Sequence, residues 1–184
     1  MALKATIFKA TLNIVDLDRH YYQDHSLTIA RHPSETDERM MVRILAYVLH
    51  ASEFLMFSKG LSENSEPELW QKSLSDEVEL WIDLGQPDEK RIRRACGRAK
   101  VVWIISYGGR TAEIWWQQVR NKLIRFENLS VINLPAEATE VLAGMVERTM
   151  QLQCMIQDGI VSISNNKQHV TVESQQWLLS GAIV

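Results

Sequence analysis

The chain has 184 residues, which favours one domain large enough to bury a hydrophobic core without disulfide staples. Hydrophobic residues make up 46% of the chain and charged residues 23%, a composition that excludes an intrinsically disordered protein. The formal net charge of −3 excludes a surface that is basic overall, so any nucleic-acid site must be a local patch.

The sequence shows neither the pattern of a signal peptide nor the cysteine spacing of a zinc finger. The N-terminal segment MALKATIFKATLNIV alternates polar and apolar residues, unlike the continuous apolar segment of a signal peptide. No apolar run approaches the length of about 18 residues that a transmembrane helix needs. Cys96 and Cys154 lie far apart without a CxxC pair, which argues against a disulfide framework. We therefore expect a cytoplasmic protein that has no membrane segment.

The N-terminal part of the chain predicts two strands followed by an amphipathic helix. Residues 3–15 and 21–31 are rich in β-forming residues, and the polar segment 16–20 between them suits a turn. Ser34 is the expected N-cap of the helix, because Glu35 follows it in the positive first turn.

Strands and helices alternate from residue 54 onwards. We expect strands at 54–57, 78–84, 101–107 and 129–135, a loop at 62–69 that turns helical at Pro67 after a Ser65 cap, and helices at 88–99, 111–125 (capped by Thr111) and 136–147. The strand–helix–strand–helix–strand order implies right-handed crossovers and a parallel core. The segments 150–156, 160–164 and 169–173 return to an antiparallel pattern, with a hairpin turn at Asp158-Gly159. The sequence thus predicts an α/β fold with a mixed sheet in a single domain.

Carboxylates are the strongest candidates for chemistry. Glu79 and Asp83 fall on one face of the strand 78–84, about 13 Å apart at the usual rise, which is too far for them to share a metal ion. Asp83 would need a partner acid from elsewhere to hold a hard cation. Three acids are candidates for that partner: Glu38, Glu66 and Glu68. The alternative is that Glu79 and Asp83 are the solvated face of a half-exposed strand.

A dense basic cluster follows this strand. Six cations fall between residues 90 and 100: Lys90, Arg91, Arg93, Arg94, Arg98 and Lys100. Such a helix suits phosphate binding. The alternative is a solvated helix face, since acids at the start of the helix and cations at its end are what the helix dipole favours. The adjacent Trp115 and Trp116 suit either core packing or an exposed stacking platform.

Five blocks of the chain resemble the YaeQ family of small bacterial proteins. They are RHPSETDERMMVRILAY, EPELW, ELWIDLGQPDEKRIRRA, EIWWQQ and TMQLQCMIQDG, and the resemblance covers essentially the whole chain. That family resembles the restriction-endonuclease-like PD-(D/E)xK superfamily in fold. The resemblance therefore implies an α/β mixed sheet flanked by helices, with additional N- and C-terminal antiparallel strands. It also implies one domain over 1–184, with the superfamily core at about 35–135.

The resemblance further implies a magnesium site. The superfamily places one acid near a proline and an acid–x–Lys motif on the next strand. Glu66 beside Pro67, together with Asp83, occupies these acid positions, and Glu38 corresponds to the acid that the first helix contributes. By this resemblance the three carboxylates would hold Mg²⁺.

The lysine of the motif is missing, because Gly85 stands in its place. By the same resemblance, Lys90 or Arg91 of the following helix would take the lysine's catalytic role, and Gln86 is a further candidate. Since that lysine positions or activates the attacking water, two functions stay open. One is a Mg²⁺-dependent, nuclease-like phosphodiesterase that acts on nucleic acid through a variant site. The other is a non-enzymatic protein that keeps the fold and binds nucleic acid or the transcription machinery, and a tryptophan-rich adaptor surface is a third alternative.

Overall fold

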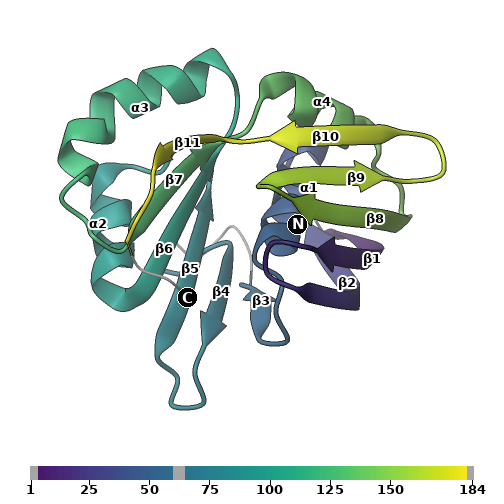
Figure 1. The fold of residues 1–184 in the computed structure, drawn as a ribbon, viewed down its shortest axis with the longest axis horizontal. Helices are drawn as coiled ribbons and strands as arrows, with labels where there is room; N and C mark the ends of the chain where they lie inside the picture. Colours follow the sequence, from purple (N-terminus) through teal and green to yellow (C-terminus); the bar gives the residue numbers. More distant parts are fainter. Residues whose placement is uncertain (1–3, 60–64, 182–184) are drawn as a thin grey trace. The chain divides into compact units, whose positions relative to one another are not determined.

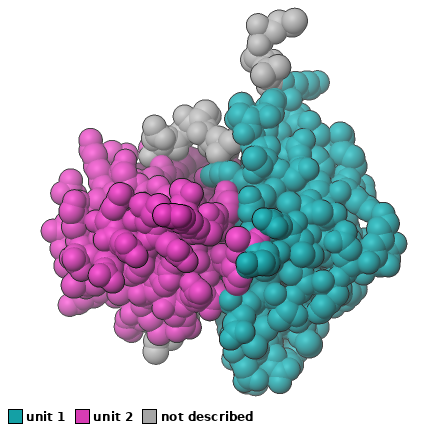
Figure 2. All heavy atoms as spheres, turned by 90° about the horizontal axis from the view of Figure 1, so that it is seen from above, with its two compact units in different colours: residues 1–49, 137–173 teal, residues 50–136, 174–184 magenta. Residues whose placement is uncertain are grey.

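The computed structural model describes residues 4–59 and 65–181. Its strands form two mixed sheets, and helices accompany both (Figure 1). The chain divides into two compact units (Figure 2). Unit 1 comprises residues 1–49 and 137–173, and unit 2 comprises residues 50–136 and 174–184. Within the described residues, no helix is both long enough and apolar enough to cross a membrane.

Unit 1 is built on a five-stranded sheet with the strand order β10-β9-β8-β1-β2. Its elements are β1 (Thr6–Asp16), β2 (Tyr21–Arg31), α1 (Asp37–Leu49), α4 (Ala136–Gly144), β8 (Thr149–Gln157), β9 (Ile160–Ser164) and β10 (His169–Glu173). Residues on one face of β1 and β8 are buried in strict alternation, as the two-residue period of a strand requires. β1 pairs antiparallel with β2 and parallel with β8, so strands from the two ends of the chain lie side by side (Figure 1).

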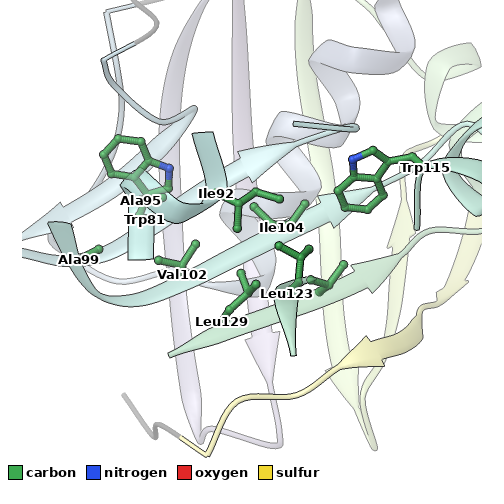
Figure 3. Close-up of a cluster of buried hydrophobic side chains, with 10 residues drawn as sticks. Trp81, Ile92, Ala95, Ala99, Val102, Ile104, Trp115, Leu123 and Leu129 are labelled. Carbon is green, nitrogen blue, oxygen red and sulfur yellow. The ribbon is translucent and has the colours of Figure 1, made fainter. Parts of the chain in front are cut away.

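Unit 2 is built on a six-stranded sheet with the strand order β11-β7-β6-β5-β4-β3. Its elements are β3 (Leu55–Phe57), β4 (Leu69–Lys72), β5 (Val78–Leu84), α2 (Glu89–Arg98), β6 (Ala99–Ser106), α3 (Arg110–Leu123), β7 (Leu129–Asn133) and β11 (Gln175–Leu178). β5, β6 and β7 are parallel and are linked through α2 and α3, which confirms the predicted strand–helix alternation. Figure 3 shows the buried cluster between these helices and strands, in which Trp81 and Ile92 are fully enclosed.

The predicted α/β class with mixed strand directions and flanking helices is confirmed, but the strands form two mixed sheets instead of the one that was predicted. The single domain expected over 1–184 stays a prediction. Its proposed core at about 35–135 begins with α1 in unit 1 and continues through unit 2.

The start of α1 differs from the prediction. The helix begins at Asp37, and the Thr36 hydroxyl accepts a hydrogen bond from Arg39 N at 3.1 Å, so Thr36 is the cap rather than Ser34. Glu35 lies before the helix instead of in its first turn. Its buried carboxylate accepts a hydrogen bond from Arg43 Nη2 at 2.7 Å, an ion pair that fixes the entry of the helix.

The predicted helical turn at Pro67 and the predicted Thr111 cap are also wrong. The predicted loop at 62–69 falls partly on residues 60–64, which lie outside the described residues; residues 65–68 form no helix, and β4 begins at Leu69. The helix α3 is capped by Gly109 without a side-chain hydrogen bond, and Thr111 lies inside its first turn. The edge strand β11 was not expected from the sequence.

Candidate site around Asp83 and Arg91

Asp83 lies at the carboxyl end of β5, a strand held between β4 and β6. The alternating pattern predicted a half-exposed polar face, but Asp83 is only 1% exposed and Trp81 on the same face is equally buried. The expectation of a solvated face is therefore wrong for Asp83, because residues 80–84 are buried on both faces of β5. The carboxyl ends of parallel strands are where α/β proteins place ligand sites.

The turn after β5 places a glycine where the expected acid–x–Lys motif would have its lysine. Gly85 has a φ of +81° and its N–H donates to Ile105 O at 2.9 Å. A side chain at this backbone conformation is strained, so glycine is favoured over lysine. The position that the motif assigns to the cation is thus used for the turn that leads the chain into α2.

Arg91 brings a cation to Asp83 from the first turn of α2. The Asp88 side chain caps this helix, accepting a hydrogen bond from Arg91 N at 2.7 Å. Arg91 then extends back over the strand end and donates from Nε to Asp83 Oδ2 at 2.8 Å and from Nη2 to Oδ1 at 2.7 Å. This is the bidentate geometry in which guanidinium and carboxylate pair most strongly. Of the two cations predicted for this role, the structure brings Arg91 to the acid.

Glu66 joins the site through its main chain. Its carbonyl oxygen accepts a hydrogen bond from Arg91 Nη2 at 2.8 Å, and the carbonyl of the preceding Ser65 accepts one from Arg98 at 2.8 Å. The Glu66 carboxylate instead lies 3.4 Å from the main-chain N–H of Lys59. Two arginines of α2 therefore hold the segment before Pro67 by its backbone, a contact that sequence reasoning missed because carbonyl positions have no residue-type signature.

The charges of the site favour a permanently ionised Arg91. Hydrogen bonding to Asp83 raises the pKa of Arg91, and the charges of Asp83, Glu68 and Asp88 raise it further, against the opposing effect of burial. The Asp83 side chain is 2% exposed and the Arg91 side chain 24% exposed. The arrangement is a buried carboxylate neutralised by a cation that closes it off from solvent.

These residues do not fit a magnesium ion as they are arranged. Both Asp83 oxygens accept hydrogen bonds from Arg91, so a hard cation would have to compete with a guanidinium that already neutralises the carboxylate. Glu79 accepts a hydrogen bond from Gln71 Nε2 at 3.1 Å and lies 3.9 Å from Lys100 Nζ. Within residues 4–59 and 65–181, no group of three or more His, Cys, Asp or Glu side chains is placed to hold a metal ion.

Glu38 is grouped by the structure with residues of unit 1. It lies in the first turn of α1 and accepts a hydrogen bond from the Thr139 hydroxyl at 2.6 Å. The other four predicted site residues, Glu66, Asp83, Lys90 and Arg91, lie in unit 2.

Lys90 and its neighbour Arg93 occupy the outer side of α2. Both are exposed, and neither forms an ion pair with another described residue. The helix therefore divides its cations, with Arg91 turned inwards against Asp83 and Lys90 and Arg93 turned to solvent.

Comparison with known proteins decides the family. Residues 1–174 match the family model described as YaeQ protein. The chain belongs to the YaeQ family.

The similarity to other YaeQ proteins extends over nearly the full length of the chains. The chain is 49% identical to "Uncharacterized protein YaeQ" of Escherichia coli (strain K12) over 177 residues, 96% of this chain and 98% of that protein. It is 47% identical to the Salmonella typhi protein of the same name, with the same shares covered. These names state no activity, so the YaeQ assignment fixes relatedness and leaves function to the site.

Two crystal structures of YaeQ proteins show the same fold. The structure from Xanthomonas axonopodis pv. citri matches with a TM-score of 0.92 at 47% identity, covering 94% of this chain and 98% of that chain. The structure from Pseudomonas syringae matches with a TM-score of 0.91 at 38% identity, covering 96% of this chain and 97% of that one. The YaeQ resemblance read from the sequence blocks is therefore confirmed.

Proposed function

We propose that this chain is a non-enzymatic nucleic-acid-binding protein that keeps a nuclease-like fold. The carrying observation is the closed Asp83–Arg91 pair, in which the acid expected to hold a metal is bound at both oxygens by an arginine. In this proposal the pair is an internal support that orients α2. The cations on the outer side of that helix make the contact with nucleic acid.

The distribution of charge on α2 supports a phosphate-binding surface. Lys90 and Arg93 are three residues apart and so are neighbours on one helix face. Cations that have no acidic partner retain their full charge for phosphates, whose neutralisation releases counterions and drives binding. A local patch of this kind is also what a chain with a net charge of −3 requires.

We also propose that the fold resembles that of the restriction-endonuclease-like superfamily. Its support is the run of three parallel strands β5, β6 and β7 with α2 between the first two and an acid at the carboxyl end of β5. A shared fold does not fix the activity, so the loss of a metal site within such a fold is physically reasonable. A cytoplasmic location belongs to the same proposal, and the transcription machinery is the alternative partner.

The test measures the binding of labelled oligonucleotides by fluorescence anisotropy, in a low-salt buffer that contains EDTA. Duplex DNA, single-stranded DNA and RNA of one sequence are compared, with the double variant Lys90→Gln/Arg93→Gln beside the wild type. The matched control Lys4→Gln/Lys9→Gln removes the same charge from exposed positions of unit 1. We expect the α2 variant to weaken binding about tenfold or more and the control variant to change it less than about twofold. Equal loss in both variants, or no binding of any of the three oligonucleotides, would overturn the proposal.

A metal-dependent phosphodiesterase is the second candidate. It is favoured by the place of Asp83 at the carboxyl end of a parallel strand, with Glu68 close enough to raise the pKa of Arg91. This function requires Arg91 to release Asp83. Calorimetry with Mg²⁺ and Mn²⁺ tests it: saturable binding by the wild type that is lost in Asp83→Asn supports the metal site, and no binding in either protein refutes it.

A further inference from the structure

Glu89 of α2 binds two cations from the end of the neighbouring helix α3. Its Oε1 atom accepts a hydrogen bond from Arg125 Nη2 at 3.1 Å, and its Oε2 atom lies 3.5 Å from Lys122 Nζ. Lys122 lies in the last turn of α3, and Arg125 follows the end of that helix. The two ion pairs therefore join the end of α3 to the first turn of α2, and the two helices lie side by side (Figure 1).

Arg93 is a third cation on the same side of α2. It follows Glu89 by four residues and so lies one turn further along that side of the helix. Cys96 continues this side, and its carbonyl oxygen accepts a hydrogen bond from Asn128 Nδ2 at 3.0 Å. Arg93 is thus flanked along α2 by two residues that contact the segment 122–128. Both oxygens of Glu89 bind cations of α3, and Arg93 forms no ion pair with another described residue.

We call Glu89, Arg93, Lys122 and Arg125 the interhelical cluster. Its three cations and one carboxylate give it a surplus of two positive charges. The side chains of Lys122 and Arg125 are 62% and 55% exposed, whereas that of Glu89 is 29% exposed. The cations that bind the acid therefore remain open to solvent. Since ion pairs between exposed side chains contribute little stability, an incoming anion can replace Glu89 as their partner at small cost.

We propose that the nucleic acid contacted by α2 continues onto the end of α3, where Lys122 and Arg125 bind its phosphates, and that Glu89 limits the affinity of this surface. The inference rests on the proposed nucleic-acid contact and extends it to a second helix. On binding, backbone phosphates take the place of the Glu89 carboxylate as partners of the two cations. The carboxylate then stays next to the bound phosphates, and its negative charge repels them.

Removing the charge of Glu89 should therefore strengthen binding. Glu89 also holds Lys122 and Arg125 near α2, which favours binding, so the two effects oppose each other. The holding effect is the smaller one, because both cations are more than half exposed and such pairs restrict them only weakly. The repulsion acts on every phosphate near the cluster, and salt screens it. An acid in a phosphate-binding surface thus has an effect opposite in sign to that of the cations around it.

The test compares variants of the full chain with the wild type by fluorescence anisotropy, in a low-salt buffer that contains EDTA. The probe is whichever of the labelled duplex DNA, single-stranded DNA and RNA the wild type binds most tightly. Glu89→Gln removes the acid, and its matched control is Glu113→Gln, an exposed acid in the first turn of α3. Glu113 precedes Lys122 by about two and a half helical turns, so it lies on the opposite side of α3.

A second pair of variants tests the cations of α3. Lys122→Gln/Arg125→Gln removes both cations of the cluster that belong to this end of the helix, and Arg110→Gln/Arg120→Gln removes two other exposed cations of α3. We expect the cluster variant to weaken binding about fivefold or more and its control less than about twofold. Glu89→Gln should tighten binding about threefold or more, and its control should change it less than about twofold.

The outcomes separate this inference from the proposed function. Binding by Glu89→Gln that is no tighter than that of the wild type, or wild-type affinity in Lys122→Gln/Arg125→Gln, would overturn the inference. If Lys90→Gln/Arg93→Gln is weakened in the same assay, the proposed function stands and the extension to α3 is wrong. No binding by the wild type would overturn both. Misfolding does not produce a gain of affinity, so Glu89→Gln decides the matter even if the double variant fails to fold.

Discussion

Replacing Arg91 with methionine should destabilise the protein by leaving Asp83 as an unpaired buried carboxylate. The Asp83 side chain is 2% exposed, and Arg91 supplies hydrogen bonds to both of its oxygens. Removing one partner of a buried ion pair costs about 3–5 kcal/mol. Because the Arg91 side chain is 24% exposed, water can reach part of the vacated space, so we expect about 3 kcal/mol, the lower end of that range.

Urea unfolding followed by circular dichroism measures this loss, provided that the slope m is the same for all variants. The double variant Asp83→Leu/Arg91→Met should recover most of the stability, because it removes both charges together. Lys90→Met, which removes an exposed cation one residue away, should stay within about 0.5 kcal/mol of the wild type.

A loss below about 1 kcal/mol for Arg91→Met would refute this reasoning. It would mean that Asp83 is solvated or bound elsewhere when Arg91 is absent. The pair would then not be an internal support, and an acid left free to bind a metal ion would become the better account of Asp83.

Three further predictions concern the rest of the molecule. Burial raises the pKa of Cys96 to about 11 and that of Cys154 to about 12, so both thiols stay protonated at pH 7.5. Both should therefore react with a thiol reagent such as dithionitrobenzoate far more slowly than in the unfolded chain. Rapid labelling of the folded protein would contradict this. Burial lowers the pKa of His25, against the opposing charge of Asp24, so the midpoint of its NMR titration should lie below the ordinary value of about 6.5. The free energy of unfolding should then decrease as the pH falls from that value through the pKa of His25 in the folded chain. A titration midpoint above about 6.5 would be the contrary result. Leu12→Ala should cost about 2–5 kcal/mol in urea unfolding because Leu12 is fully buried in β1, whereas Thr11→Ala on the exposed face of the same strand should cost less than about 1 kcal/mol.

The sequence was sufficient to predict most of the elements. The alternation in residues 3–15 and 21–31 predicted β1 and β2, and the alternating strands and helices predicted the parallel run from β5 to β7. The parallel pairing of β1 with β8 was not predictable in this way, because it joins segments from opposite ends of the chain. The period of the hydrophobic residues indicates that a segment is a strand. It carries no information about which distant segment that strand pairs with.

The site was predicted less completely than the fold. The alternation of polar and apolar residues assigned Asp83 to the same face of β5 as Trp81. It did not predict that this face would be buried. Arg91 was predicted as one of two substitutes for the missing lysine, and the Asp88 cap is what selects it by fixing the first turn of α2. The backbone contacts at Ser65 and Glu66 depend on carbonyl positions and left no pattern in the residue types.

The most direct test of the proposed function is the salt dependence of oligonucleotide binding in EDTA. Each phosphate contact adds about 0.9 to the slope of log Kd against log salt for duplex DNA and about 0.7 for single strands. If Lys90 and Arg93 each contact a phosphate, their double glutamine variant should have a slope that is lower by about 1.4–1.8. An unchanged slope, or binding that vanishes in EDTA and returns with Mg²⁺, would contradict a metal-independent contact through α2.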